Sequence, residues 1–161
     1  MNPAFSTFQR KITNRLTFRL FMLKRLPAAY FAGLSIVSLD EKHCAVAVRY
    51  KWFTQNPFRS MYFAVQSMAA EMSTGLLASG HVYERRPAIS MLVVGVQGNF
   101  FKKVTGRVVF TCDDGMKIHD SIESAIATGE GKTIGCRSIG INDAGETVAE
   151  FVITWSFKAR K

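Results

Sequence analysis

Residues 56–80 read NPFRSMYFAVQSMAAEMSTGLLASG, and this stretch decides the fold. It is rich in Ala, Met, Gln, Glu and Leu and holds one β-branched apolar residue, Val65, a composition that favours a helix over about Ser60 to Leu77. Asn56-Pro57 predicts a break before the helix, and Gly80 a stop after it. Apolar side chains point in most directions round this helix, so we expect it to be buried on nearly all sides, which requires a sheet wrapped round it.

The remaining chain supplies such a sheet. Runs of apolar and β-branched residues separated by polar turn sequences predict six strands, at residues 33–39, 44–50, 88–101, 104–112, 132–141 and 147–157. Asp113-Asp114-Gly115 is expected to form a turn, and residues 121–127 a short helical turn. The resulting order is a helix, two strands, the long helix and four strands, which predicts an α+β fold with one antiparallel sheet wrapped round one helix.

The N-terminal quarter of the chain concentrates the positive charge. Residues 1–39 carry six Lys and Arg and no acid, against a net charge of +9 for the whole chain. Between Phe5 and Leu26 apolar residues recur at near-helical spacing and predict one apolar stripe: Phe5, Phe8, Ile12, Leu16, Leu20 and Leu23. We therefore expect residues 1–27 to form one amphipathic basic helix that ends at Pro27. This helix could cover the core, lie on a membrane surface or act as a targeting segment. A single helix of this kind lacks the interleaved aromatics of a nucleic-acid module, so no nucleic-acid partner is expected.

Length and composition indicate one domain. We expect 161 residues to form a single unit, with residues 28–161 as its core. No apolar run reaches the roughly 18 residues of an integral membrane segment. Three cysteines, Cys44, Cys112 and Cys136, lie widely spaced in apolar stretches, which predicts buried thiols and a reducing, cytoplasmic location.

The histidines show no spacing typical of a metal site. His43, His81 and His119 stand far apart, without a pair at helical spacing, and no Cys-x-x-Cys motif accompanies them. We therefore expect no metal and predict that all three histidines lie at the surface.

The order of the elements, with an Asn-containing turn just before the long helix, resembles the hotdog fold. Asn56 and Glu71 have the separation of the Asn and the acid in the PaaI-like branch of hotdog thioesterases. Further segments resemble a poorly characterised hotdog family within the thioesterase superfamily, a domain of unknown function: Arg25–Pro27, Asn56–Ser60, Ala69–Gly75, Gly98–Phe101 and Trp155–Lys158. The resemblance covers most of the chain. It implies a six-stranded sheet round one long helix with an additional N-terminal helix, and a homodimer, with pairing of dimers into a tetramer left open.

The sequence departs from the PaaI-like pattern at the start of the helix. That pattern has His-Gly-Gly where this chain has Tyr62-Phe63-Ala64. In the family, the glycines let the thioester approach helix N-terminal N–H groups, which polarise its carbonyl. Phe63 is expected to crowd this approach, and Tyr62 cannot replace histidine as a base near pH 7.

Two polar residues are the candidate catalytic groups. Glu71 is a carboxylate in an otherwise apolar helix, which is costly unless the group is paired, hydrogen-bonded or protonated. It could be a general base with a raised pKa, or a structural group that binds a partner's backbone or an arginine. Asn56 could hold the thioester carbonyl or the water, or simply turn the chain before the helix.

Six further residues are candidates for binding the substrate. Ser60 fits a helix cap better than a nucleophile, because no histidine stands at a motif spacing to activate it. Gln66 and Ser67 could orient a water or a carbonyl, or merely pack. Tyr62 and Phe63 would line an acyl pocket. Arg59, favoured over Arg85-Arg86 and Lys102-Lys103, could reach the phosphates of coenzyme A or, like them, remain a solvated surface charge.

Two functions follow from these residues and the resemblance. The first is an acyl-CoA or acyl-carrier thioesterase that acts at a dimer interface through water activated by a carboxylate, with coenzyme A as part of the substrate and no other cofactor. The alternative is a non-catalytic hotdog protein that binds acyl-CoA or lipid, which the bulk of Phe63 favours.

Overall fold

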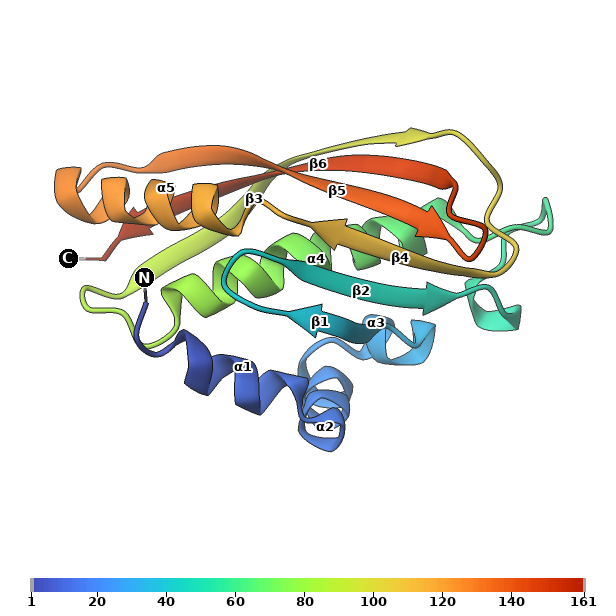
Figure 1. The fold of residues 1–161 in the computed structure, drawn as a ribbon, viewed down its shortest axis with the longest axis horizontal. Helices are drawn as coiled ribbons and strands as arrows, with labels where there is room; N and C mark the ends of the chain where they lie inside the picture. The colour runs from blue at the N-terminus through green and yellow to red at the C-terminus, as the bar shows by residue number, and fades with distance from the viewer. Residues whose placement is uncertain (1, 161) are drawn as a thin grey trace.

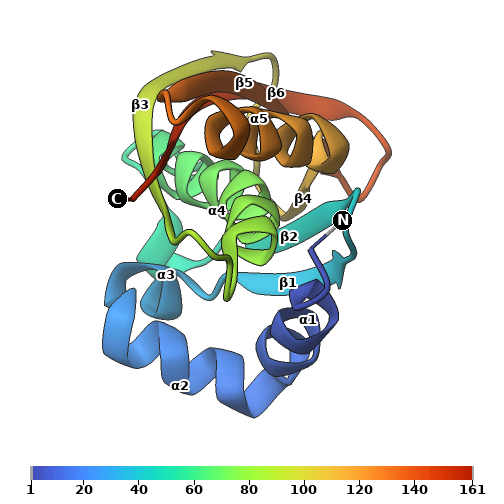
Figure 2. The ribbon, with the colours of Figure 1, turned by 90° about the vertical axis from the view of Figure 1, so that its left-hand side faces the viewer.

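The computed structural model describes residues 2–160 and has one six-stranded antiparallel sheet curved round a long helix (Figures 1 and 2). The strand order is β1-β2-β4-β5-β6-β3. The strands are β1 (Ser35–Leu39), β2 (Cys44–Arg49), β3 (Ile89–Phe100), β4 (Arg107–Cys112), β5 (Lys132–Asn142) and β6 (Thr147–Ala159). The predicted α+β class and the six-stranded sheet round one central helix are confirmed.

The central helix, α4, spans Phe63–Val82 and begins three residues later than predicted. A loop delays it, because an isolated bridge pairs Gln55 with Met61 and Tyr62 N donates to Thr54 O. The loop follows a short 3-10 helix, η1 (Trp52–Thr54). From Met72 to Ala78 every residue of α4 is buried, so burial on all sides is confirmed for this part of the helix.

Polar side chains in the buried part of α4 bond within the chain. Ser73 Oγ lies 2.8 Å from Ser138 Oγ on β5, and Trp155 Nε1 on β6 donates to Thr74 Oγ1 at 2.9 Å. His81 Nε2 lies 2.9 Å from the carbonyl oxygen of Glu41. These bonds fix the helix against the sheet on several sides, because a buried polar group without a partner is costly.

The N-terminal segment forms three helices, where the sequence predicts one. They are α1 (Phe5–Thr13), α2 (Arg15–Arg25) and α3 (Pro27–Ala32). Asn14 is extended and its side chain accepts from Thr17 N, so it caps α2 and separates it from α1. Pro27 disfavours a helical conformation at Leu26, which ends α2.

The break at Asn14 also rotates the apolar stripe of the N-terminal segment. Phe5 and Ile12 on α1 are buried as the periodicity predicts, but Phe18 and Met22 are the buried residues of α2. The leucines that continue the predicted stripe, Leu16, Leu20 and Leu23, are exposed. Gly80 admits α1 against α4, because a Cβ there would lie 2.4 Å from the Phe5 ring.

A further helix, α5 (Gly115–Thr128), replaces the predicted turn at 113–115 and the short helical turn at 121–127. Its buried stripe is Ile118, Ile122 and Ala125, which packs against α4 and the sheet (Figure 2). Asp114 stands at its N-terminal boundary. A helix of this length has only three buried apolar positions among many polar ones, so its periodicity is weak in the sequence.

The cysteines follow the sequence prediction and two of the histidines do not. All three thiols are buried, and burial raises the pKa of Cys112 to about 12. His81 is fully buried between Phe5 and His119, and His119 is half-buried on α5, so their predicted surface positions are wrong. Their burial arises from α1 and α5, whose positions the sequence does not reveal. Within residues 2–160, no helix has the length and apolar character needed to cross a membrane.

Candidate functional site

A cavity of about 350 Å³ lies at the start of α4. One wall is the loop before the helix together with its first turns, and the other is the segment that follows β3. The cavity brings together four predicted site residues, Asn56, Ser60, Phe63 and Gln66. The second wall contains Lys102 and Lys103, which the sequence offers as possible phosphate contacts, and three residues that were not predicted as site residues: Phe100, Phe101 and Val104.

Asn56 shapes the loop that forms the first wall. Its Oδ1 accepts from Phe58 N at 2.9 Å, and from both the backbone N–H and the hydroxyl of Ser60 at 3.2 Å. Its Nδ2 donates to Met61 O at 3.5 Å. Asn56 therefore turns the chain before the helix. Ser60 does not cap α4, since it bonds to Asn56 and Tyr62 occupies the cap position.

Gln66 offers a free acceptor at the cavity. The residue is only 4% exposed, and its Nε2 donates to Met61 O at 3.4 Å. Its Oε1 is buried without a hydrogen-bond partner among the described residues. An acceptor left in this state costs about 1–3 kcal/mol, which a bound water or ligand would offset.

The first turn of α4 also has free donors. Val65 N bonds to Tyr62 O, whereas the N–H groups of Phe63 and Ala64 bond to no carbonyl of residues 2–160. Such free N–H groups, together with the helix dipole, favour negative charge at a helix N-terminus. The start of α4 is therefore able to stabilise an oxyanion.

Exposed aromatic rings surround this end of the helix. The Phe63 ring is 56% exposed, with centroid distances of 4.8 Å to Tyr62 and 6.4 Å to Phe100. Phe58 in the preceding loop and Phe101, which follows Phe100, are also exposed. Arg59 is exposed in the loop, and Ser67 is half-buried on the helix. Tyr62, Arg59 and Ser67 do not line the cavity.

Glu71 lies outside this cavity, two turns along α4 from its start. Its side chain is half-buried, and desolvation raises the pKa of its carboxyl group. No residue in the described part of the chain forms a hydrogen bond or an ion pair with this carboxylate. A Cβ at Gly75 would lie 3.1 Å from Glu71 Oε1 and 3.2 Å from the Trp155 ring, which places the carboxylate beside β6. One chain alone does not bring Asn56 and Glu71 into a common cavity.

Strand β3 pairs with β6 and forms one edge of the sheet. It is twelve residues long, and Leu92, Val94 and Val96 are each more than half exposed. A long apolar edge strand is a template for pairing with another chain. The sequence predicts the strand but not its edge position, because strand order depends on contacts far apart along the chain.

Comparison with known proteins connects this geometry to others. The family model described as Domain of unknown function (DUF4442) matches residues 14–157. A search of curated proteins gave no sequence match.

Three solved structures illustrate the structural likeness. A protein of unknown function from Pseudomonas aeruginosa, described as a probable thioesterase, has a TM-score of 0.75 at 16% identity, over 90% of this chain and 96% of that one. One of unknown function from Chlorobaculum tepidum has a TM-score of 0.78 at 17% identity, over 94% and 97%. A thioesterase from Haemophilus influenzae has a TM-score of 0.62 at 13% identity, over 87% and 88%. These likenesses show the fold, which is the predicted hotdog fold.

Proposed function

The chain belongs to the family described as domain of unknown function DUF4442, a hotdog, thioesterase-like family, and from this premise we propose that it hydrolyses acyl-CoA or acyl-carrier thioesters with Glu71 as general base. The observation that carries the proposal is the state of Glu71, a partly buried carboxylate with a raised pKa and no partner within residues 2–160. A carboxylate with a raised pKa is a stronger base for a water. Of the structural alternatives, an ion pair with an arginine of the same chain finds no support in these contacts, and a bond to a partner's backbone stays open.

The proposed site is shared by two subunits of a homodimer. The apolar edge of β3 supports this arrangement, because pairing with a second copy would cover Leu92, Val94 and Val96. Glu71 lies beside β6, the neighbour of β3, so it is on the side of the molecule that such a partner would approach. In this arrangement Glu71 of one subunit serves the start of α4 in the other.

The proposed reaction needs only groups already described and one water. Glu71 takes a proton from the water as its oxygen forms a bond to the thioester carbonyl carbon. The N–H groups of Phe63 and Ala64 hold the resulting oxyanion, and Gln66 Oε1 accepts a hydrogen bond from the water. The carbon–sulfur bond then breaks, and the thiolate receives the proton from Glu71, which gives a carboxylic acid and a free thiol.

The aromatic rings round the cavity favour an apolar acyl group. Tyr62, Phe63 and Phe100 form a connected cluster at its mouth, and Lys102 and Lys103 line the same cavity. An apolar acyl chain would pack on the rings, while the lysines would attract the phosphates of coenzyme A. We therefore propose a fatty or aromatic acyl group as the preferred substrate.

The test is thiol release from a panel of short, medium, long-chain and aromatic acyl-CoAs by the purified protein. Glu71→Gln keeps the side-chain shape and removes the base, so we expect kcat/KM to fall by about 10²–10⁴-fold. Asp120→Asn, the same change on the exposed side of α5, is the control and should leave the rate unchanged.

The second candidate function is acyl-thioester binding without hydrolysis. The bulk of Phe63 at the helix start favours it, because the ring stands where the PaaI-like pattern has glycine. Saturable binding of acyl-CoA without thiol release from any member of the panel would establish this alternative and reject the hydrolase.

A further inference from the structure

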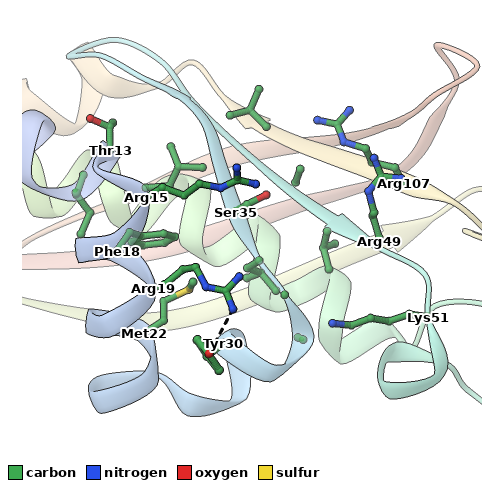
Figure 3. Close-up of a pocket in the computed structure, with 18 residues that line it drawn as sticks. Thr13, Arg15, Phe18, Arg19, Met22, Tyr30, Ser35, Arg49, Lys51 and Arg107 are labelled. Carbon is green, nitrogen blue, oxygen red and sulfur yellow. Dashed lines mark hydrogen bonds between the residues drawn. The ribbon is translucent and has the colours of Figure 1, made fainter.

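A second, larger cavity of about 670 Å³ lies between the N-terminal helices and the strands β1 and β2 (Figure 3). Its walls come from the end of α1, from α2, from the segment that joins α3 to β1, and from β2 with the residues that follow it. It shares no lining residue with the cavity at the start of α4. The two cavities are therefore separate, and this volume falls within the range of small-molecule sites.

The inner wall of this cavity is apolar. Phe18 and Met22 face it from α2, Leu34 from the entry to β1 and Val48 from β2, and all four are buried. Ile36 on β1 adds to this surface. The wall is continuous with the hydrophobic core and suits a hydrocarbon chain.

The rim of the cavity carries positive charge only. Five lining residues are basic and none is acidic: Arg15, Arg19, Arg49, Lys51 and Arg107. Arg15 and Arg19 reach from α2 on one side, and Lys51 reaches towards them from the other (Figure 3). Basic side chains from two separate segments thus face one space from opposite sides.

The charges on this rim are largely uncompensated within the chain. Arg19 donates to the Tyr30 hydroxyl at 3.3 Å, and Lys51 donates to the Phe31 carbonyl oxygen at 3.0 Å. Among the described residues, only Arg107 of these five has a carboxylate within ion-pair distance, with 3.7 Å between its Nη1 and Asp143 Oδ1. Arg15 and Arg49 form no ion pair with the described residues. Converging cations without acids repel one another and attract an anion.

We propose that this cavity binds a single-chain amphiphilic anion, of which a long-chain fatty acid is the simplest. The hydrocarbon chain lies on the wall of Phe18, Met22 and Val48, and the carboxylate meets the guanidinium groups of Arg15 and Arg19. Arginine matches a carboxylate through two parallel hydrogen bonds. The site does not involve Glu71, so the inference stands whether or not the proposed hydrolysis is correct.

Binding of laurate to the full-length protein, measured by isothermal titration below the micelle concentration, tests this inference. We expect saturable binding of one laurate per chain. 1-Dodecanol has the same chain without the charge. Its affinity should be lower by at least about tenfold, because it loses the charged hydrogen bonds. Inorganic phosphate, an anion without a chain, should show no saturable binding.

Two variants locate the ligand, and a matched one controls for charge. Arg15→Gln with Arg19→Gln should weaken laurate binding about tenfold or more. Lys24→Gln with Arg25→Gln removes the same charge from the same helix outside the cavity, and should leave the affinity within about twofold. Ser35→Trp fills the cavity from an exposed position on β1 and should abolish binding. Circular dichroism confirms that each variant is folded.

Several results would overturn the proposal. If 1-dodecanol binds as tightly as laurate, the basic side chains do not hold the carboxylate. If the two double variants lose the same affinity for laurate, the effect comes from the general surface charge and not from Arg15 and Arg19. Retention of full affinity by Ser35→Trp would place laurate elsewhere. Glu71→Gln should bind laurate as the native chain does, and loss of binding in that variant would assign the ligand to the thioester site.

Discussion

The two halves of α4 differ in what surrounds them. In the second half, from Met72 to Val82, the chain's own sheet and helices cover the helix, and Ser73 and Thr74 bond to β5 and β6. In the first half, the Phe63 N–H, the Gln66 Oε1 and the Glu71 carboxylate have no partner within residues 2–160. Folding of one chain therefore covers the second half, where His81 Nδ1 is the buried side-chain atom left without a partner among residues 2–160, while the first half retains groups suited to a ligand and a second subunit.

The largest expected effect on stability comes from the second half. Leu77→Ala removes a fully buried side chain, and the resulting cavity should lower the free energy of unfolding by about 2–5 kcal/mol. Phe63→Ala, in the first half, removes an exposed ring and should cost much less. Urea denaturation followed by circular dichroism measures both. Equal losses would contradict the distinction between the halves.

The next effect concerns the hydrogen bonds of the second half. Thr74→Val is close in shape but leaves Trp155 Nε1 without its acceptor, so we expect a loss of about 1–3 kcal/mol in unfolding free energy. Trp155→Phe in the same background tests the cause, because it removes the unpaired donor. The double variant should lose less unfolding free energy than the two single variants lose together. Additive losses would show that the bond between Trp155 and Thr74 does not contribute to stability.

The two titratable groups of α4 should give pH dependences of opposite sign. Desolvation raises the pKa of Glu71 in the folded protein above 4.5. The protonated carboxyl group therefore makes its full contribution to stability below pH 4.5, and this contribution is lost as pH rises through the pKa of Glu71 in the folded state. Burial lowers the pKa of His81 below 6.5, so its stability is full above pH 6.5 and falls as pH drops below that value. Each contributes at most about 1.4 kcal/mol per pH unit within its window.

Urea denaturation across pH 4 to 8 measures these slopes against the variants Glu71→Gln and His81→Gln. Relative to the native chain, Glu71→Gln should gain stability as pH rises, and His81→Gln should lose less stability as pH falls below 6.5. Parallel curves for native and variant proteins would refute the assigned pKa directions.

The smallest effect on stability is expected at Gln66, and it should separate stability from function. Gln66→Leu removes an acceptor that has no partner together with the long bond from Nε2 to Met61 O, and Met61 O keeps its bond from Asn56 Nδ2. The two changes oppose each other, so unfolding free energy should change by less than about 1 kcal/mol. Thioester turnover should nevertheless fall, because the water loses an acceptor. A loss of more than about 2 kcal/mol would exceed the cost of the Nε2 bond and show that Gln66 Oε1 has a partner in the folded protein. Unchanged turnover would exclude Gln66 from the reaction.

Much of the fold could be predicted from the sequence because its signals are local. The composition of residues 60–77 and the alternation of the strands at 104–112 and 147–157 identify α4 and the sheet directly. The helices α1 and α2 were merged, since a continuous apolar period conceals the cap at Asn14. The helix α5 was mostly missed, because a short stripe of Ile118, Ile122 and Ala125 carries little periodic signal.

The candidate site was predictable as a set of residues but not as a geometry. Asn56, Ser60, Phe63 and Gln66 meet because they adjoin one another at the start of α4. Lys102 and Lys103 could be named as possible phosphate contacts but not placed at this cavity, because their position depends on the pairing of β3 with β6 along the sheet. The separation of fifteen residues between Asn56 and Glu71 likewise says nothing about whether one chain or two complete the site.

Subunit mixing tests the shared site most directly. Ala64→Trp blocks the start of α4, and Glu71→Gln removes the base, so each homodimer should be inactive. When the two variants are unfolded together and refolded in equal amounts, half of the dimers are mixed and each has one intact site. We therefore expect thiol release to recover to about one quarter of the native rate. No recovery in a mixture shown to contain mixed dimers would contradict a site that joins Glu71 of one subunit to the α4 start of the other.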